Sequence, residues 1–384
     1  MAKRRYSVLT LMAAGTLWAG SFSIASAQVP GPSPATPRSG MPLADGLITS
    51  ADGIQLAPGE QIIDGPPELK MFTEQALPSG QLAGVGGTSP CGPSCYDACE
   101  PFYYVIAEAL YMQRRGLSGS TLSTGFAFDD YEFEIAPRVT LGRQFDCTDG
   151  YEFIFTGLLD WEERLDAVGP GLNTVLVAAP PLDPGVFDPF RNSTFQSQGI
   201  RASYDSYEFH RTYNGWDVVR TLVGLRTLLY NEEYYFIGTD GVDNAILYSS
   251  ADNVLVGPQL GLEMLYPVNN WIDVGARFKG GLYMNFADAE TRLYNDSFST
   301  TIPAAGGAGK ETTIAAALEI SSQTRMRLTD SITGIVGFDL WYMGGLVETR
   351  SQLPNPFPQN AGSSLDPNDE IFFLGVTGGI QVVF

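Results

Sequence analysis

The sequence predicts an all-β fold, a transmembrane antiparallel up-and-down β-barrel of about ten strands that follows a disordered N-terminal segment. Three observations predict it. From residue 102 onward, segments of nine to fifteen residues alternate apolar and polar side chains, which is the period of strands with two different faces. The connections between these segments are alternately long and short, as in barrels with extended outer loops and tight inner turns. The chain also ends on such a strand, with Phe384 as its last residue.

The strand candidates are even in number, which places both chain ends on the periplasmic side of a membrane barrel. Residues 234–237 and 245–248 are either an extra hairpin, which gives twelve strands, or longer strands that leave the membrane. The ten candidates are 102–114, 130–143, 150–161, 203–211, 217–230, 253–266, 271–284, 313–327, 332–344 and 370–384.

The start of the chain predicts export. Lys3, Arg4 and Arg5 precede an apolar run and the small residues 25–27, the pattern of a secretory signal peptide. The segment that follows is rich in Pro, Gly and Ser and has no sustained periodicity, so it is expected to be disordered. The predicted organisation is a signal peptide at 1–27, a periplasmic linker with a cysteine cluster at 28–101, and an outer-membrane barrel at 102–384.

Composition favours a protein that contacts lipid and argues against nucleic acid as a partner. Charged residues are 17% of the chain, below the roughly 25% of soluble domains, and aromatic residues are 12%. The net charge of −21 would repel a phosphate backbone. Acidic residues in predicted outer loops, including Asp183, Asp188 and Asp240, are expected to contact neighbouring molecules or cations, or simply to remain solvated.

Alternate residues of the last strand form one apolar face, which is typical of the closing strand that the barrel-assembly machinery recognises in outer membranes. This assembly face consists of Phe372, Leu374, Val376, Ile380, Val382 and Phe384.

Aromatic residues near the predicted strand ends suggest two interfacial girdles in the lipid headgroup regions. The girdle residues are Tyr111, Trp161, Tyr230, Tyr283, Trp341 and Tyr342 at one end and Tyr151, Trp216, Tyr266, Trp271 and Phe384 at the other.

The polar faces of the strands predict a charged lumen. A ten-stranded barrel is narrow enough for side chains to fill it, so these charges either pair into a plug or line a small pore. The predicted lumen charge network is Glu108, Glu132, Glu134, Arg138, Glu152, Asp160, Glu208, Arg220, Arg226, Glu263, Asp273, Arg277, Lys279, Glu319, Arg325, Arg327 and Asp339.

Four cysteines in an exported chain favour disulfides over metal binding. The candidates are Cys91, Cys95, Cys99 and Cys147. Cys147 falls in a short turn on the same side as the other three, so a disulfide that ties the linker to the barrel base is one alternative, and an unpaired thiol is the other.

Several segments resemble a β-barrel porin family of planctomycete outer membranes, and the resemblance covers about residues 102–384. The resemblance implies an outer-membrane barrel and a porin-like function, and it carries over no catalytic residue. The similar segments are 216–226 with Glu232 and Glu233, 253–263, 315–319 with Asp330, Gly337 and Trp341, 107–110, and 206–209, of which 253–263 is the most specific.

Two functions follow as alternatives. The first is a passive, porin-like channel for small solutes, with a mouth shaped by loops such as 162–202. The second is a plugged structural or surface-recognition barrel without transport. An enzyme is not predicted, because His210 is the only histidine and falls near the predicted periplasmic rim on the lumen side, whereas hydrolysis of membrane lipid would need a site at the outer rim facing lipid. We therefore predict no catalytic residue, no metal and no cofactor, with membrane lipid, assembly machinery and small solutes or cations as partners.

Overall fold

The computed structural model describes residues 101–384 except 118–120, 217, 298 and 300. The predicted signal peptide lies outside the described residues. So does the predicted linker up to residue 100, which contains Cys91, Cys95 and Cys99.

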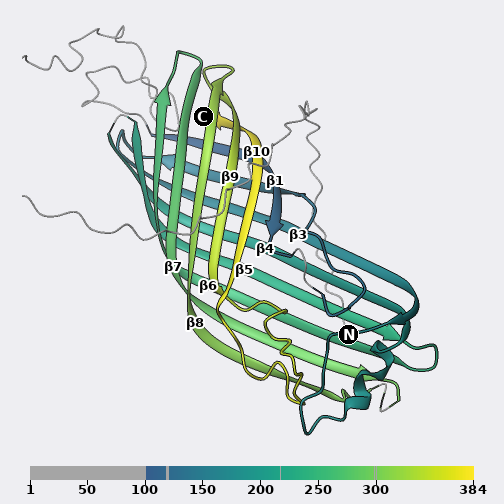
Figure 1. Ribbon diagram of the computed structural model, residues 1–384. Helices are drawn as coiled ribbons and strands as arrows, with labels where there is room; N and C mark the ends of the chain where they lie inside the picture. Colours follow the sequence, from purple (N-terminus) through teal and green to yellow (C-terminus); the bar gives the residue numbers. More distant parts are fainter. Residues whose placement is uncertain (1–100, 118–120, 217, 298, 300) are drawn as a thin grey trace, which may run out of the picture. The chain divides into compact units, whose positions relative to one another are not determined.

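Ten strands in the described part of the chain close into an antiparallel barrel (Figure 1), which confirms the predicted fold. Each strand pairs with the next along the chain, and β1 pairs with β10 to close the barrel. The alternative of twelve strands is wrong, because residues 234–237 and 245–248 pair with each other as extensions of β5 and β6. The strands are β1 Phe102–Arg115, β2 Glu134–Gln144, β3 Asp149–Leu172, β4 Ser193–Trp216, β5 Val219–Thr239, β6 Asn244–Pro267, β7 Ile272–Asn295, β8 Ala305–Arg327, β9 Ile332–Leu346 and β10 Asp369–Val383, with one 3₁₀ helix, η1 Pro184–Phe190.

The two ends of the barrel differ. We call the end with the short connections 145–148, 217–218, 268–271 and 328–331 the turn end. The opposite end, which carries the connections 116–133, 173–192, 240–243, 296–304 and 347–368, is the loop end. The predicted alternation of short and long connections is confirmed, except that 240–243 at the loop end is itself short because β5 and β6 run on together.

Strand length divides the barrel into two parts. Strands β3 to β8 have 21 to 24 residues each, whereas β1, β2, β9 and β10 have 11 to 15. Toward the loop end only the six long strands continue, as a curved wall. The loop after β9 runs along the open side of this wall (Figure 1), and Phe357 from this loop stacks edge-on against Phe187 of η1 with ring centroids 5.7 Å apart.

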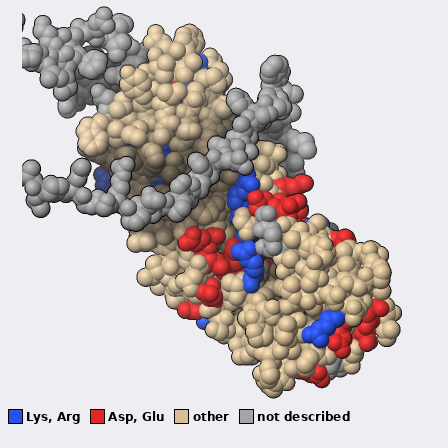
Figure 2. All heavy atoms as spheres, viewed as in Figure 1, with Lys and Arg blue, Asp and Glu red and all other residues tan. Residues whose placement is uncertain are grey.

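The outer face of the turn-end half is apolar. On β6 the outward residues from Val256 to Tyr266 are apolar, and at ~3.3 Å rise and about 45° tilt such a stretch spans roughly 25 Å, the height of a bilayer core. Beyond this band the outward residues are charged, as in Glu162, Arg164 and Asp166 of β3. Figure 2 shows the same division, with the turn-end half mostly tan and charged side chains gathered toward the loop end. No helix in the described residues is long and apolar enough to cross a membrane.

A β-bulge in β3 lies at the boundary between the two halves. Gly157 and Leu158 together lie opposite the single residue Asp205 of β4. Leu158 has a left-handed backbone with φ of 64°, and its N–H donates to the Asp205 carboxylate at 2.9 Å. Because the bulge adds one residue to β3, the side chains that follow it change faces. Leu159 and Trp161 therefore point into the lumen, where both are buried.

Candidate functional site in the barrel lumen

The turn-end half of the lumen is filled by ion pairs centred on Glu263 of β6. This fully buried carboxylate accepts hydrogen bonds from Arg277 at 2.9 Å and from Arg325 at 2.6 Å, and it lies 3.4 Å from the Arg220 guanidinium. Arg220 also forms an ion pair with Glu152 at 2.7 Å. One buried anion therefore contacts three cations, and among the described residues it is the ion-pair partner on which Arg277 and Arg325 depend for compensation.

Two further groups complete this ion-paired layer. Lys279 lies 2.8 Å from Glu208 and 2.8 Å from Glu319, and Arg226 bonds Glu319 at 2.5 Å. On the opposite side of the lumen, Arg138 holds Glu108 at 2.7 Å and Asp339 at 3.1 Å. Strands β1 to β9 each contribute at least one charge to this layer, all of them at most 8% exposed.

Most of the predicted lumen charges lie where the sequence placed them. Asp273 and Arg327 are half-buried at the turn end, 3.7 Å apart, and Glu134 is half-buried on the lumen-facing side of β2. The residues found buried in the ion-paired layer are Glu108, Arg138, Glu152, Glu208, Arg220, Arg226, Glu263, Arg277, Lys279, Glu319, Arg325 and Asp339.

Two predicted lumen charges are not in the lumen. Glu132 lies in the loop before β2, where it is exposed and its backbone N–H donates to Glu163. Asp160 points outward and pairs with Arg201 on the outer wall, because the bulge shifts every following residue of β3 to the other face.

An aromatic layer fills the lumen beyond the ion-paired layer. The rings of Trp161, Tyr204, Trp341 and Phe373 pack with centroids 5.2 to 6.1 Å apart. The Tyr204 hydroxyl accepts a hydrogen bond from Arg226 at 2.5 Å, which joins the two layers. Offset and tilted ring pairs at these distances are favourable beyond simple area burial.

This layer corrects part of the predicted girdles. Trp161, Tyr230, Tyr283 and Trp341 point inward and are at most 2% exposed. Outward-facing girdle residues with at least 40% exposure include Tyr111, Tyr151, Trp216, Tyr266, Trp271 and Phe384, and Tyr342 is half-buried.

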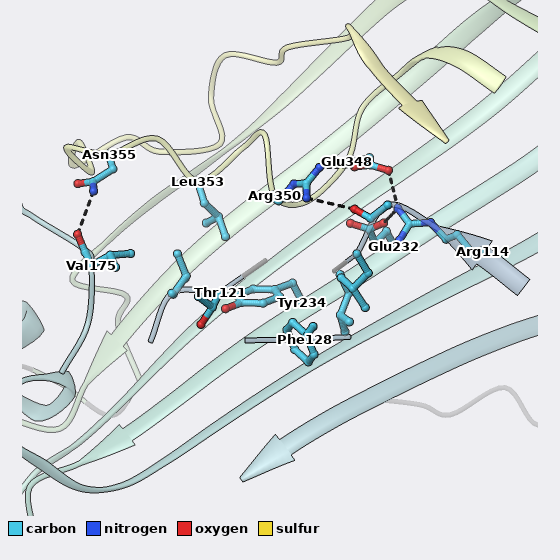
Figure 3. Close-up of a pocket in the computed structure, with 14 residues that line it drawn as sticks. Arg114, Thr121, Phe128, Val175, Glu232, Tyr234, Glu348, Arg350, Leu353 and Asn355 are labelled. Atoms are coloured by element: carbon cyan, nitrogen blue, oxygen red, sulfur yellow. Dashed lines mark hydrogen bonds and ion pairs between the residues drawn. The ribbon is translucent and has the colours of Figure 1, made fainter. Parts of the chain in front are cut away.

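A third group of charges lies nearer the loop end, beyond the apolar band. Arg114 of β1 bonds Glu232 of β5 at 2.7 Å and Glu348 of the β9–β10 loop at 2.5 Å. Burial and the neighbouring Glu232 raise the pKa of Glu348 to about 7, against the opposing attraction of Arg114. These side chains border a cavity of about 260 Å³, whose other lining residues are mostly apolar (Figure 3).

Three other predicted features can be placed. His210 is fully buried in the lumen with its Nε2 3.5 Å from Glu208, and Gly224 on β5 leaves room for its ring. Cys147 in the β2–β3 turn is disulfide-bonded, and the connectivity stays a prediction because the other cysteines lie outside the described residues. The assembly face of β10 points outward, with Val376 51% exposed, and its recognition by assembly machinery stays a prediction.

Sequence reasoning missed the Arg114 group, although a signal was present. Arg114 has the same strand parity as Glu108, and Glu232 has the same parity as Arg226, so extending both strands by a few residues would have placed them in the lumen. Glu348 could not be found in this way, because it lies in a loop.

A closed barrel with an apolar outer band and polar pairs inside defines the class of transmembrane β-barrels. No family model matches the chain, and no curated protein matches it in sequence. The resemblance to the planctomycete family therefore stays a prediction.

Among solved structures, the chain is similar to the outer membrane protease OmpT from Escherichia coli at 10% identity and a TM-score of 0.42, over 74% of this chain and 97% of that one. It is also similar to the Ralstonia pickettii toluene transporter TbuX, at 9% identity and a TM-score of 0.30, over 79% and 97% of the two chains. A third is Ail, the attachment invasion locus protein of Yersinia pestis, at 8% identity and a TM-score of 0.22, over 74% and 99%. Similarities this distant assign neither an activity nor a family.

Proposed function

We propose that this protein is an occluded outer-membrane β-barrel that acts through its loop end and is not an enzyme. The apolar band supports insertion in a bilayer, and the signal-peptide pattern at residues 1–27 supports export. By analogy with other such barrels, the short turns and both chain ends face the periplasm and the loop end faces outward. Membership of the planctomycete outer-membrane family is part of this proposal.

The observation that supports occlusion is the burial of the lumen charges. A solute-conducting pore leaves its lining side chains in contact with water. Here Glu263 and Asp339 have no exposed surface, and Arg220 and Arg226 are 2% exposed. The aromatic layer blocks the same lumen a second time. Of the two functions predicted from the sequence, this geometry favours the plugged recognition barrel.

A passive, porin-like channel for small solutes is the other predicted function. It requires the ion-paired layer to separate, which exposes several charges that now compensate each other. His210 supports the non-enzymatic part of the proposal, because its imidazole lies within the filled lumen beside Glu208, away from any surface that a substrate reaches.

Single-channel recording in planar bilayers tests occlusion. The purified, refolded protein should give no stable single-channel current steps, and folded insertion is verified by a heat-dependent gel shift and by protection from protease. Arg226→Ala, which opens the junction of the two layers, should give occasional steps. Stable steps in the wild type that change in size with Glu263→Gln would instead establish the pore.

A further inference from the structure

The cavity near the loop end lies between the short strands and the long wall. Its lining comes from the end of β1, from the loops after β1, β3 and β9, and from β4 and β5 (Figure 3). The volume of about 260 Å³ exceeds the roughly 150 Å³ that suffices for benzene in an apolar cavity. The apolar wall consists of Leu117, Leu122, Phe128, Val175, Ile200 and Leu353, with the Tyr234 ring.

The polar end of the cavity has a surplus of negative charge. Among the described residues the lining holds Glu232 and Glu348 with Arg114 and Arg350. A third carboxylate, Asp369, lies behind Glu348 and accepts a hydrogen bond from its backbone N–H. The Arg350 side chain is 55% exposed to solvent, so water screens much of its charge. Arg114 is held between two of the carboxylates, so an anionic ligand would meet those carboxylates as well. Charge complementarity therefore favours a cationic group.

One carboxylate oxygen at this end has unused capacity to accept hydrogen bonds. Both oxygens of Glu232 are occupied, one by Arg114 and the Tyr230 hydroxyl, the other by the backbone N–H and hydroxyl of Thr349. For Glu348, Oε1 accepts from Arg114, while Oε2 lies 3.7 Å from Arg350, beyond hydrogen-bond distance. Glu348 lines the cavity, so a donor bound there can reach Oε2.

We propose that this cavity binds a small amphipathic amine, with the ring or alkyl body against the apolar wall and the ammonium group hydrogen-bonded to Glu348. The inference rests on the recognition role proposed for the loop end and names a ligand class for it. Bilayer recording tests occlusion and a binding titration tests the cavity, so the two can fail separately.

The site has a built-in pH dependence. Glu348 faces Arg114 on β1, Tyr131 in the loop before β2, Tyr230 and Glu232 on β5, Asp369 on β10 and Arg350 in its own loop. With its pKa raised to about 7, Glu348 is only partly ionised near neutral pH. An ammonium with a pKa of about 10 stays charged throughout this range and favours the ionised carboxylate. Affinity should therefore fall as pH drops through about 7.

Isothermal titration calorimetry of the refolded barrel in nonionic detergent tests the proposal, with matched micelles as the blank. The probe is 2-phenylethylamine, compared with the uncharged 2-phenylethanol and the anionic phenylacetate, which are similar in size. The amine should bind saturably and at least about tenfold more tightly than the alcohol, the range expected for one hydrogen bond to a charged group. Phenylacetate should not bind.

Two variants and a control locate the binding. Glu348→Gln should weaken amine binding about tenfold and remove its pH dependence. Leu353→Trp, which fills the cavity from a loop, should abolish binding and serves as an independent second test. Glu162→Gln makes the same chemical change on the exposed outer wall and should bind like the wild type. Unchanged affinity in both cavity variants, or tighter binding of phenylacetate than of the amine, overturns the proposal.

Discussion

The two halves of the barrel are built with opposite polarity. In the turn-end half the outer face is apolar and the lumen holds buried ion pairs, whereas toward the loop end the outer face is charged and the interior is mainly aromatic and aliphatic around the single Arg114 group of charges. The surrounding medium explains the reversal, because lipid selects an apolar exterior and water selects a polar one. The loop-end half is therefore stabilised like a soluble β-protein, and the turn-end half by charge compensation.

Most strands make this change by switching residue type on a constant face. On β5 the lumen side carries Arg220 and Arg226 and then Leu228, Tyr230 and Phe236. Strand β3 instead uses its bulge and moves the opposite face inward. The inward and outward faces are therefore set separately in each half, and four measurements test this division.

The largest effect is expected at the centre of the ion-paired layer. Glu263→Gln removes the ion-pair partner of Arg277 and Arg325 and one of the two partners of Arg220, and we expect a loss of about 3–5 kcal/mol in the free energy of unfolding. Equilibrium unfolding in urea, followed by the heat-dependent gel shift, measures it. Glu162→Gln on the outer wall is the control and should change little. Equal stability of the two variants would show that the layer is not held by charge.

The aromatic layer is tested by the same substitution at two tryptophans. Trp161→Ala opens a cavity among packed rings and should lower the free energy of unfolding by about 3–4 kcal/mol. Trp216→Ala removes a side chain that is 70% exposed at the turn end and should cost about 1 kcal/mol or less. The two refolded proteins are compared by urea titration. A larger cost at Trp216 would contradict the assignment of Trp161 to a packed interior.

Stability should also depend on pH through Glu348. The ordinary pKa of 4.5 is raised to about 7 in the folded protein, so the folded state binds more protons between these values. This contribution to stability is full below about pH 4.5 and is lost as pH rises through about 7. Glu348→Gln, which mimics the protonated form, should therefore be roughly 1–3 kcal/mol more stable than the wild type at about pH 8.

The advantage of Glu348→Gln should vanish near pH 5, where the wild-type carboxyl is itself protonated. Urea titrations of both proteins at the two pH values provide the measurement. The same difference at both values would mean that Glu348 keeps an ordinary pKa.

The smallest effect is expected at the bulge. Leu158→Gly relieves a left-handed conformation that costs a non-glycine residue about 1–2 kcal/mol, and this offsets the lost contact of the side chain with lipid. We expect the free energy of unfolding to change by no more than about 1 kcal/mol. Leu225→Gly removes a similarly exposed side chain from regular strand and should cost clearly more in urea unfolding. Equal costs would indicate that the backbone at Leu158 is unstrained.

The sequence predicted the turn-end half well because lipid contacts the outer face of every strand there, so apolar and polar residues alternate strictly. The ten strands and most of the ion-paired residues came from that period, and their order around the barrel came from the alternating connection lengths. Strand ends at the loop end were missed, since segments such as 162–172 and 193–202 are largely polar outside and include turn-forming residues such as Gly169, Pro170 and Gly171, like loops.

What could not be predicted depends on single-residue geometry and on loops. The inward turn of Trp161 and the outward turn of Asp160 need the bulge at Gly157 and Leu158, which leaves no mark in the hydrophobic period. The cavity needs Glu348 and Leu353 to fold back from the β9–β10 loop onto β5, a contact between residues more than a hundred positions apart.

At the bulge in β3 the number of residues matters more than which residue is present, because the extra residue sets which side chains of the following segment face inward. Replacing Leu158 changes one side chain, but deleting it would turn the whole segment from Leu159 to Leu172 inside out, sending Trp161 into solvent and Asp160 into the protein interior. Natural variants are therefore expected to differ in the residue at position 158, within the types that accept a left-handed backbone, and to tolerate neither insertion nor deletion there.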